Sequence, residues 1–195
     1  MGSNTEPLTF PKPKFITGGC LCNAIRYRVD FPEDHDFLKS SSTCQCTQCR
    51  KQTGSLFFSC HKISPASNFQ FIGDDFSSGT PPAALKIYQA SKQAERAFCG
   101  NCGSFIYWKP LADSTEPGSG NKMDYLCFTV GTTDPLYLFG EGADGIEVPN
   151  EGFGLALANG GGYHVWCRNE IKGVTDESEL LGKGTKGRGI RLQEE

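Results

Sequence analysis

Closely spaced cysteines constrain this chain more than any other feature of its sequence. Seven of its ten cysteines lie in three short motifs: Cys20-Leu21-Cys22, Cys44-Gln45-Cys46-Thr47-Gln48-Cys49 and Cys99-Gly100-Asn101-Cys102. Cysteines two or three residues apart can share one cation, whereas disulfide frameworks usually join residues that are far apart in sequence. Residues 1–14 lack the apolar core of a signal peptide. We therefore expect the reduced thiols of a cytoplasmic protein rather than the disulfides of a secreted one.

The first and third motifs are predicted to form one metal site. Cys20 and Cys22 are two residues apart, so both sulfurs can project to the same side of an extended segment. Cys99 and Cys102 frame a tight turn whose glycines relax its steric demands. Four thiolates at about 2.3 Å from Zn²⁺ complete a tetrahedron and leave no position for a substrate, so this site would stabilise the fold. Ordinary buried cysteines are the alternative, but they need no paired spacing.

The second motif is predicted to form a different kind of metal site. Cys44, Cys46 and Cys49 place three thiolates within six residues, and no fourth ligand lies nearby in the sequence. Three protein ligands and an open position are typical of a catalytic zinc, so these three cysteines are the candidate catalytic residues. A distant residue could instead close the site as a second structural zinc. The candidates for that role are Cys60, His61, Cys127, His164 and Cys167.

Two basic residues follow the second motif directly. Positive charge at Arg50 and Lys51 would offset the negative charge of three thiolates and attract an anionic cofactor or substrate. Glutathione, which has two carboxylates, would suit such a site. Solvated surface charges are the alternative. Glu95 and Arg96, just before the third motif, are likewise either pocket residues or an exposed pair.

The rest of the sequence predicts a mainly β protein with few short helices. The chain has 24 glycines and 11 prolines, and its apolar stretches are short. One helical turn is expected over 47–52, ending at Gly54, and 90–97 reads as a polar link. We expect a flexible arm over 1–14, one domain over 15–175 and a tail over 176–195. The predicted strands are 24–29, 56–60, 69–72, 85–89, 104–108, 125–130 and 163–167.

The charge and hydropathy of the chain limit the classes of partner that we expect it to bind. Lysine plus arginine number 19 and aspartate plus glutamate number 22, a net charge of −3. Such a chain has no broad basic field, so nucleic acid is not an expected partner. No stretch approaches the roughly 18 consecutive apolar residues of a membrane span, so no membrane partner is expected either. A small-molecule substrate is compatible with this charge and hydropathy. The sequence does not predict the oligomeric state.

The motifs and their neighbours together resemble one protein family. The chain is similar to the glutathione-dependent formaldehyde-activating enzyme family, to which the centromere protein V domain is also similar. The likeness covers about 15–134 well and the remainder loosely. The segments that carry it are Gly18-Gly19-Cys20-Leu21-Cys22, Ile25-Arg26-Tyr27, Cys44-x-Cys46-x-x-Cys49-Arg50-Lys51-x-x-Gly54, Phe98-Cys99-x-x-Cys102-Gly103 and Val130-Gly131-Thr132-Thr133-Asp134.

The resemblance implies a β-tent of antiparallel sheets with two zinc ions per chain. Cys20, Cys22, Cys99 and Cys102 would hold the structural zinc, and Cys44, Cys46 and Cys49 the second one. The implied activity is that of a carbon–sulfur lyase, which adds glutathione to formaldehyde or a related electrophile, or releases it.

Two other functions stay open at this stage. One is a zinc-dependent lyase or isomerase that acts on a carbonyl-bearing metabolite without glutathione. The other is a non-catalytic zinc scaffold. Family members commonly have histidine where Gln45 stands, so an acid or base role at this position is in doubt. The segment 163–176 departs from shorter members and is expected to reshape the pocket.

Overall fold

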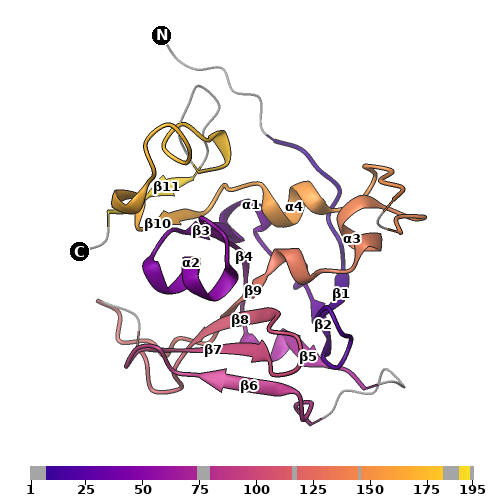
Figure 1. The fold of residues 1–195 in the computed structure, drawn as a ribbon, viewed down its shortest axis with the longest axis horizontal. Coiled ribbons are helices and arrows are strands. Elements are labelled where there is room, and N and C mark those ends of the chain that lie inside the picture. Colours follow the sequence, from indigo (N-terminus) through magenta and orange to yellow (C-terminus); the bar gives the residue numbers. More distant parts are fainter. Residues whose placement is uncertain (1–7, 74–79, 116–117, 145, 182–188, 194–195) are drawn as a thin grey trace.

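The fold is mainly β, as the sequence predicts. A computed structural model of the chain describes residues 8–73, 80–115, 118–144, 146–181 and 189–193. These residues form eleven strands in two sheets, together with four short α-helices (Figure 1). None of the helices in these ranges is both long and apolar enough to cross a membrane.

The smaller sheet has three antiparallel strands in the order β1-β2-β5. Its strands are β1 (Phe15–Gly19), β2 (Arg26–Asp30) and β5 (Phe69–Phe71). Alternate residues of β2 face the core, so Tyr27 and Val29 are fully buried while their neighbours are partly exposed. This two-residue period is the pattern from which strand 24–29 is predicted.

The larger sheet has the strand order β11-β10-β3-β4-β9-β8-β7-β6. Strand β10 pairs in parallel with β3 and with β11, and the other pairs are antiparallel. The strands are β3 (Ser41–Cys44), β4 (Phe58–Ile63), β6 (Leu85–Tyr88), β7 (Ala94–Cys99), β8 (Phe105–Pro110), β9 (Leu126–Thr129), β10 (Tyr163–Val165) and β11 (Ile190–Arg191).

Four strands lie outside the ranges predicted from the sequence. They are β1, β3 and the two-residue β11, for which no strand is predicted, and β7, which begins within the predicted link 90–97. Within the predicted tail 176–195, Leu181 is buried and Ile190–Arg191 pairs with β10.

The helices are short, and the longest of them has seven residues. They are α1 (Phe37–Ser40), α2 (Thr47–Thr53), α3 (Pro135–Phe139) and α4 (Gly154–Ala158), and single 3₁₀ turns cover Ala66–Asn68, Val130–Thr132, Cys167–Asn169 and Glu179–Leu181. Helix α2 confirms the helical turn predicted over 47–52. It ends at Gly54, whose left-handed φ of 66° suits a residue without a Cβ.

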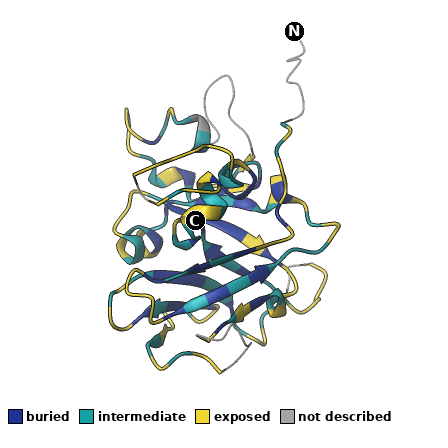
Figure 2. Ribbon diagram, turned by 90° about the vertical axis from the view of Figure 1, so that its right-hand side faces the viewer, coloured by how far each residue is buried: buried dark blue, intermediate teal, exposed yellow. Residues whose placement is uncertain are grey.

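The main core lies between the two sheets. Tyr27 of the smaller sheet stacks on Phe69 at 4.6 Å between ring centroids and also contacts Phe128 of the larger sheet. Leu157 of α4 covers the same cluster. Figure 2 shows that the buried residues concentrate along the strands, whereas the connecting loops are exposed. Burial of this kind contributes most of the stability of such a domain.

Candidate functional site

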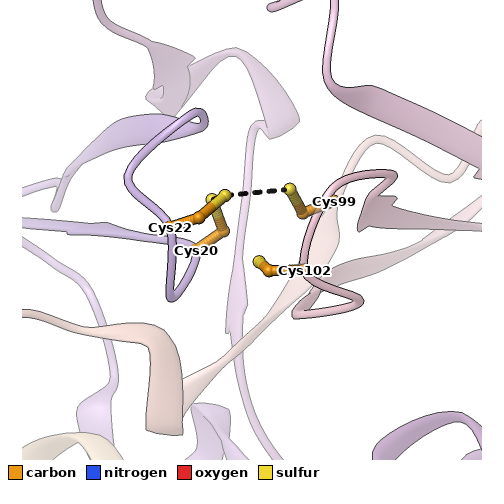
Figure 3. Close-up of side chains that lie close together, drawn as sticks. All are labelled: Cys20, Cys22, Cys99 and Cys102. Atoms are coloured by element: carbon orange, nitrogen blue, oxygen red, sulfur yellow. Dashed lines mark hydrogen bonds between the residues drawn. The ribbon is translucent and has the colours of Figure 1, made fainter.

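The first and third cysteine motifs meet between the two sheets. Cys20 and Cys22 lie in the turn after β1, and Cys99 and Cys102 lie at the turn from β7 to β8. Their four sulfurs point toward one another (Figure 3) and all lie within 4.8 Å of each other. The Cys22 Sγ is 3.6 Å from that of Cys20 and 3.7 Å from that of Cys99. The cluster therefore joins the smaller sheet to the larger one.

These distances fit a single tetrahedral cation. Four sulfurs at about 2.3 Å from a central Zn²⁺ would be about 3.8 Å from one another. The backbone N–H of Ile25 also donates to the Cys20 Sγ at 3.2 Å, which favours a thiolate at that position. Burial raises the pKa of the Cys20 thiol to about 12. A bound dication would reverse this effect, because it favours the deprotonated thiol.

The second motif gathers at the junction of β3 and α2. Cys44 ends β3, Cys46 caps the N-terminus of α2, and Cys49 lies in its first turn. The Cys46 Sγ accepts a hydrogen bond from the Cys49 N–H at 3.3 Å, so the helix cap itself orients this sulfur. All three sulfurs lie within 4.8 Å of one another. We call these three residues the cysteine triplet; it could hold a metal ion by the same donor chemistry.

No fourth histidine, cysteine or carboxylate joins the triplet within the described part of the chain. The two histidines that were candidates to close it have other partners. The His61 Nδ1 lies 3.0 Å from the carbonyl oxygen of Leu157, and the His164 Nδ1 lies 2.8 Å from the Thr43 hydroxyl.

The three cysteines considered for the same role also lie outside the group. Cys167 is directed to the carbonyl oxygen of His164 at 3.1 Å, and Cys60 to that of Ser42 at 3.6 Å. Cys60 and Cys127 pack in the small apolar cluster that surrounds the triplet, but they are not among its grouped sulfurs. Among the described residues, no histidine, cysteine or carboxylate therefore supplies a fourth ligand to the triplet.

The residue between the first two cysteines of the triplet points away from them. Gln45 is buried, and its Oε1 accepts a hydrogen bond from the Thr175 hydroxyl at 2.9 Å. Its backbone N–H donates to Val165, and its carbonyl oxygen accepts from Asn169. The segment 163–176 thus packs against the loop of the triplet. Gln45 is held as a structural residue there.

The basic residues near the triplet differ in their surroundings. Lys51 is exposed and lines a pocket of about 390 Å³, and the Arg50 Nε is buried without a hydrogen-bond partner among the described residues. Arg96, which the sequence leaves undecided, is buried and lines the same pocket. The remaining lining residues are Gln48, Gln52, Tyr88 and Ala90. The pocket therefore lies between α2 and the edge of the larger sheet formed by β6 and β7.

Comparisons with known proteins agree with this architecture. A family model described as glutathione-dependent formaldehyde-activating enzyme matches residues 15–134. A Halomonas elongata protein provisionally named for that activity is 29% identical over 97 residues, which cover 47% of this chain and 54% of the relative. An uncharacterized lyase of Schizosaccharomyces pombe is 32% identical over 93 residues, which cover 47% of this chain and 55% of the relative.

The curated relatives and the family model match the chain over different lengths. The chain spans about half the length of the curated relatives it matches. The family model, in contrast, covers more than half of the chain and all three cysteine motifs. By this match the chain belongs to the glutathione-dependent formaldehyde-activating enzyme family.

Proposed function

We propose that this protein is a zinc-dependent carbon–sulfur lyase that adds a thiol, with glutathione as the first candidate, to an aldehyde or related electrophile, or catalyses the reverse release. The observation that carries the proposal is the cysteine triplet, which has three sulfurs within 4.8 Å and no fourth donor among the described histidine, cysteine and carboxylate groups. An open position beside three protein ligands is the arrangement that permits chemistry at a metal.

The two cysteine clusters would have different roles. Cys20, Cys22, Cys99 and Cys102 would hold a structural zinc, because four thiolates complete its coordination. Cys44, Cys46 and Cys49 would hold a second zinc, which when bound supplies the charge that keeps a thiol deprotonated or polarises a carbonyl.

The reaction itself balances without a further reactant. The S–H bond of the thiol breaks, a bond forms between sulfur and the carbonyl carbon, and the proton passes to the carbonyl oxygen. The reverse release returns the proton to sulfur. Phe58, Phe105 and Trp108 pack around the triplet and limit the access of water from the side of the sheet. Arg50 and Lys51 remain candidates for binding an anionic group of the substrate.

The test uses matched cysteine variants. Cys46→Ala removes one of the three grouped sulfurs, whereas Cys60→Ala removes a buried neighbouring thiol outside the group. We expect the purified wild type to contain two zinc ions and to accelerate adduct formation from glutathione and formaldehyde, followed by NMR. Cys46→Ala should lose one zinc and the acceleration, and Cys60→Ala should keep both. A fully metal-loaded wild type that does not change the reaction rate would refute the proposal.

A second candidate substrate class follows from the Schizosaccharomyces pombe relative, whose name specifies only a lyase. The same triplet could act on a carbonyl-bearing metabolite without glutathione. Screening aldehydes and conjugated ketones with and without the thiol separates the two, since only the first activity requires glutathione.

A further inference from the structure

A buried arginine lies beside the triplet without a described partner for much of its charge. Arg96 lies on β7 between Tyr88 of β6 and Trp108 of β8, and only 4% of its surface is exposed. Its Nε and Nη1 atoms are buried, and no acceptor in the described part of the chain bonds either one. A buried guanidinium without acceptors carries a large desolvation cost. An acceptor for these two donor atoms must come from outside the described residues, and a bound ligand can supply it.

The pocket that Arg96 lines has the composition of an anion site. Its other cation is Lys51, which is exposed and free to approach a ligand, and two glutamine side chains add polar groups. None of the six lining residues is acidic. The Gln48 Nε2 donates to the Ala90 carbonyl oxygen at 3.2 Å and so ties α2 to the other wall of the pocket. Both walls are therefore held by the fold.

The pocket also lies next to the cysteine triplet. Gln48 directly precedes Cys49 on α2, and Lys51 and Gln52 lie on the following turn of the same helix. Arg96 also pairs across the sheet with Trp108, which packs in the apolar cluster around the triplet. A small molecule with an anionic group at Arg96 would thus have its remaining atoms within reach of the triplet.

We propose that Arg96 binds a carboxylate of the small-molecule substrate, and that Lys51 assists it from the rim of the pocket. This assignment rests on the proposed function and deepens it, because it makes a carboxylate, rather than the thiol alone, a requirement for tight binding. A carboxylate at this point supplies the acceptors that the guanidinium lacks, through charge-assisted hydrogen bonds. Arg96 is then a specificity residue for the substrate and takes no part in bond making.

The test measures binding apart from chemistry. S-methylglutathione keeps both carboxylates of glutathione but has no thiol to ionise, and its diethyl ester lacks the carboxylate charges. Calorimetric titration of the metal-loaded protein should show the acid binding at least about tenfold more tightly than the ester. Arg96→Gln should weaken binding of the acid by a similar factor and leave binding of the ester unchanged. Lys51→Gln should have a smaller effect, about threefold.

Two controls keep the result interpretable. Lys172→Gln removes an exposed positive charge outside the pocket and should not alter binding of the acid. The comparison of acid with ester on the wild type needs no substitution, so the test survives if Arg96→Gln fails to fold. Absence of binding by the acid, equal binding of acid and ester, or an unchanged affinity in a folded Arg96→Gln variant would each overturn the assignment.

Different results would refute the assignment of Arg96 as a carboxylate-binding residue and the proposed lyase function. If the protein accelerates adduct formation, but Arg96→Gln lowers kcat/KM equally for glutathione and for 2-mercaptoethanol, the lyase function stands and the carboxylate assignment falls. If S-methylglutathione binds through Arg96 but no thiol adduct forms faster, the carboxylate assignment stands and the lyase function falls.

Discussion

A buried pair of histidines predicts how the stability of this protein responds to pH. His61 on β4 is fully buried among Phe31, Phe37 and Phe128, and its Nε2 lies 2.8 Å from the Nε2 of His35. Its Nδ1 lies 3.0 Å from the Leu157 carbonyl oxygen, which can only accept, so the Nδ1–H donates there. With His61 neutral, its Nε2 has no proton and accepts from the Nε2–H of His35. This arrangement requires His61 to be neutral.

The size of the effect follows from the protonation of His61. Burial, with the charge of His35 as a second cause, lowers the pKa of His61 to about 3 from its ordinary 6.5. The unfolded chain therefore binds a proton before the folded one as the pH falls. Stability is full above about pH 6.5 and is lost progressively down to about pH 3. Between pH 7.5 and pH 5.5 the loss for His61 alone is about 1.4 kcal/mol. Burial also lowers the pKa of His35, which adds to the loss in the same direction.

The perturbation is His61→Gln, which keeps an amide donor and an acceptor at this position but does not titrate. Urea unfolding is measured at pH 7.5, 6.5 and 5.5 with the same concentration of free zinc. Acid also weakens binding of metal by thiolates, but the variant retains every cysteine, so that contribution is common to both proteins. The wild type should lose about 1.4 kcal/mol more than the variant over this range. Equal losses in the two proteins would refute the reasoning.

Three further predictions concern the junction of the sheets. Gly18→Ala should destabilise the fold by about 1–3 kcal/mol in urea unfolding, because the added Cβ would lie 2.4 Å from the Tyr27 ring, and an unchanged midpoint would contradict this close approach. Cys99→Ala should release one metal ion, by metal analysis, and lower the melting temperature more than removal of a triplet sulfur does, since the first cluster joins the sheets. Asp134→Asn should cost about 1–3 kcal/mol, because it removes the negative charge and replaces one of the two oxygens that accept from Arg26, at 2.7 and 2.5 Å, with an amide donor. An Asp30→Asn control at the more exposed ion pair of β2 should cost less.

The sequence predicted the cysteine clusters better than it predicted the strands around them. Spacing within Cys20–Cys22 or Cys99–Cys102 limits how far apart two sulfurs can lie, whatever the fold. The prediction that the two pairs share one site concerns residues far apart in the sequence. It depends on each pair supplying two of the four ligands of a tetrahedral ion. The structure brings all four sulfurs together. In this chain, cysteine spacing thus predicted the sulfur clusters more reliably than hydrophobic periodicity predicted the strands.

Two of the unexpected strands, β3 and β7, have polar or small residues at buried positions. In β3, Ser41 and Thr43 are buried and are satisfied by hydrogen bonds to Gly160 and His164 rather than by apolar packing. In β7, Arg96 is buried together with the small residues Ala94 and Ala97. Neither segment shows an apolar alternation, so pairing with neighbouring strands decides their conformation. The burial of Arg96, and with it the pocket, therefore could not be read from the sequence.

Strand β7 connects the pocket beside the triplet to the first cysteine cluster. β7 carries Arg96 to the pocket beside the triplet, and three residues later it ends at Cys99 in the first cluster. The other half of that cluster follows β1, in the smaller sheet. A metal in the first cluster would therefore hold the end of β7 against the smaller sheet and limit the movement of Arg96 relative to α2. If the first cluster holds a closed zinc site and the triplet an open one, as proposed, the closed site would in this way set the geometry of the open one, because a buried cation binds an anion well only when its position is determined in advance.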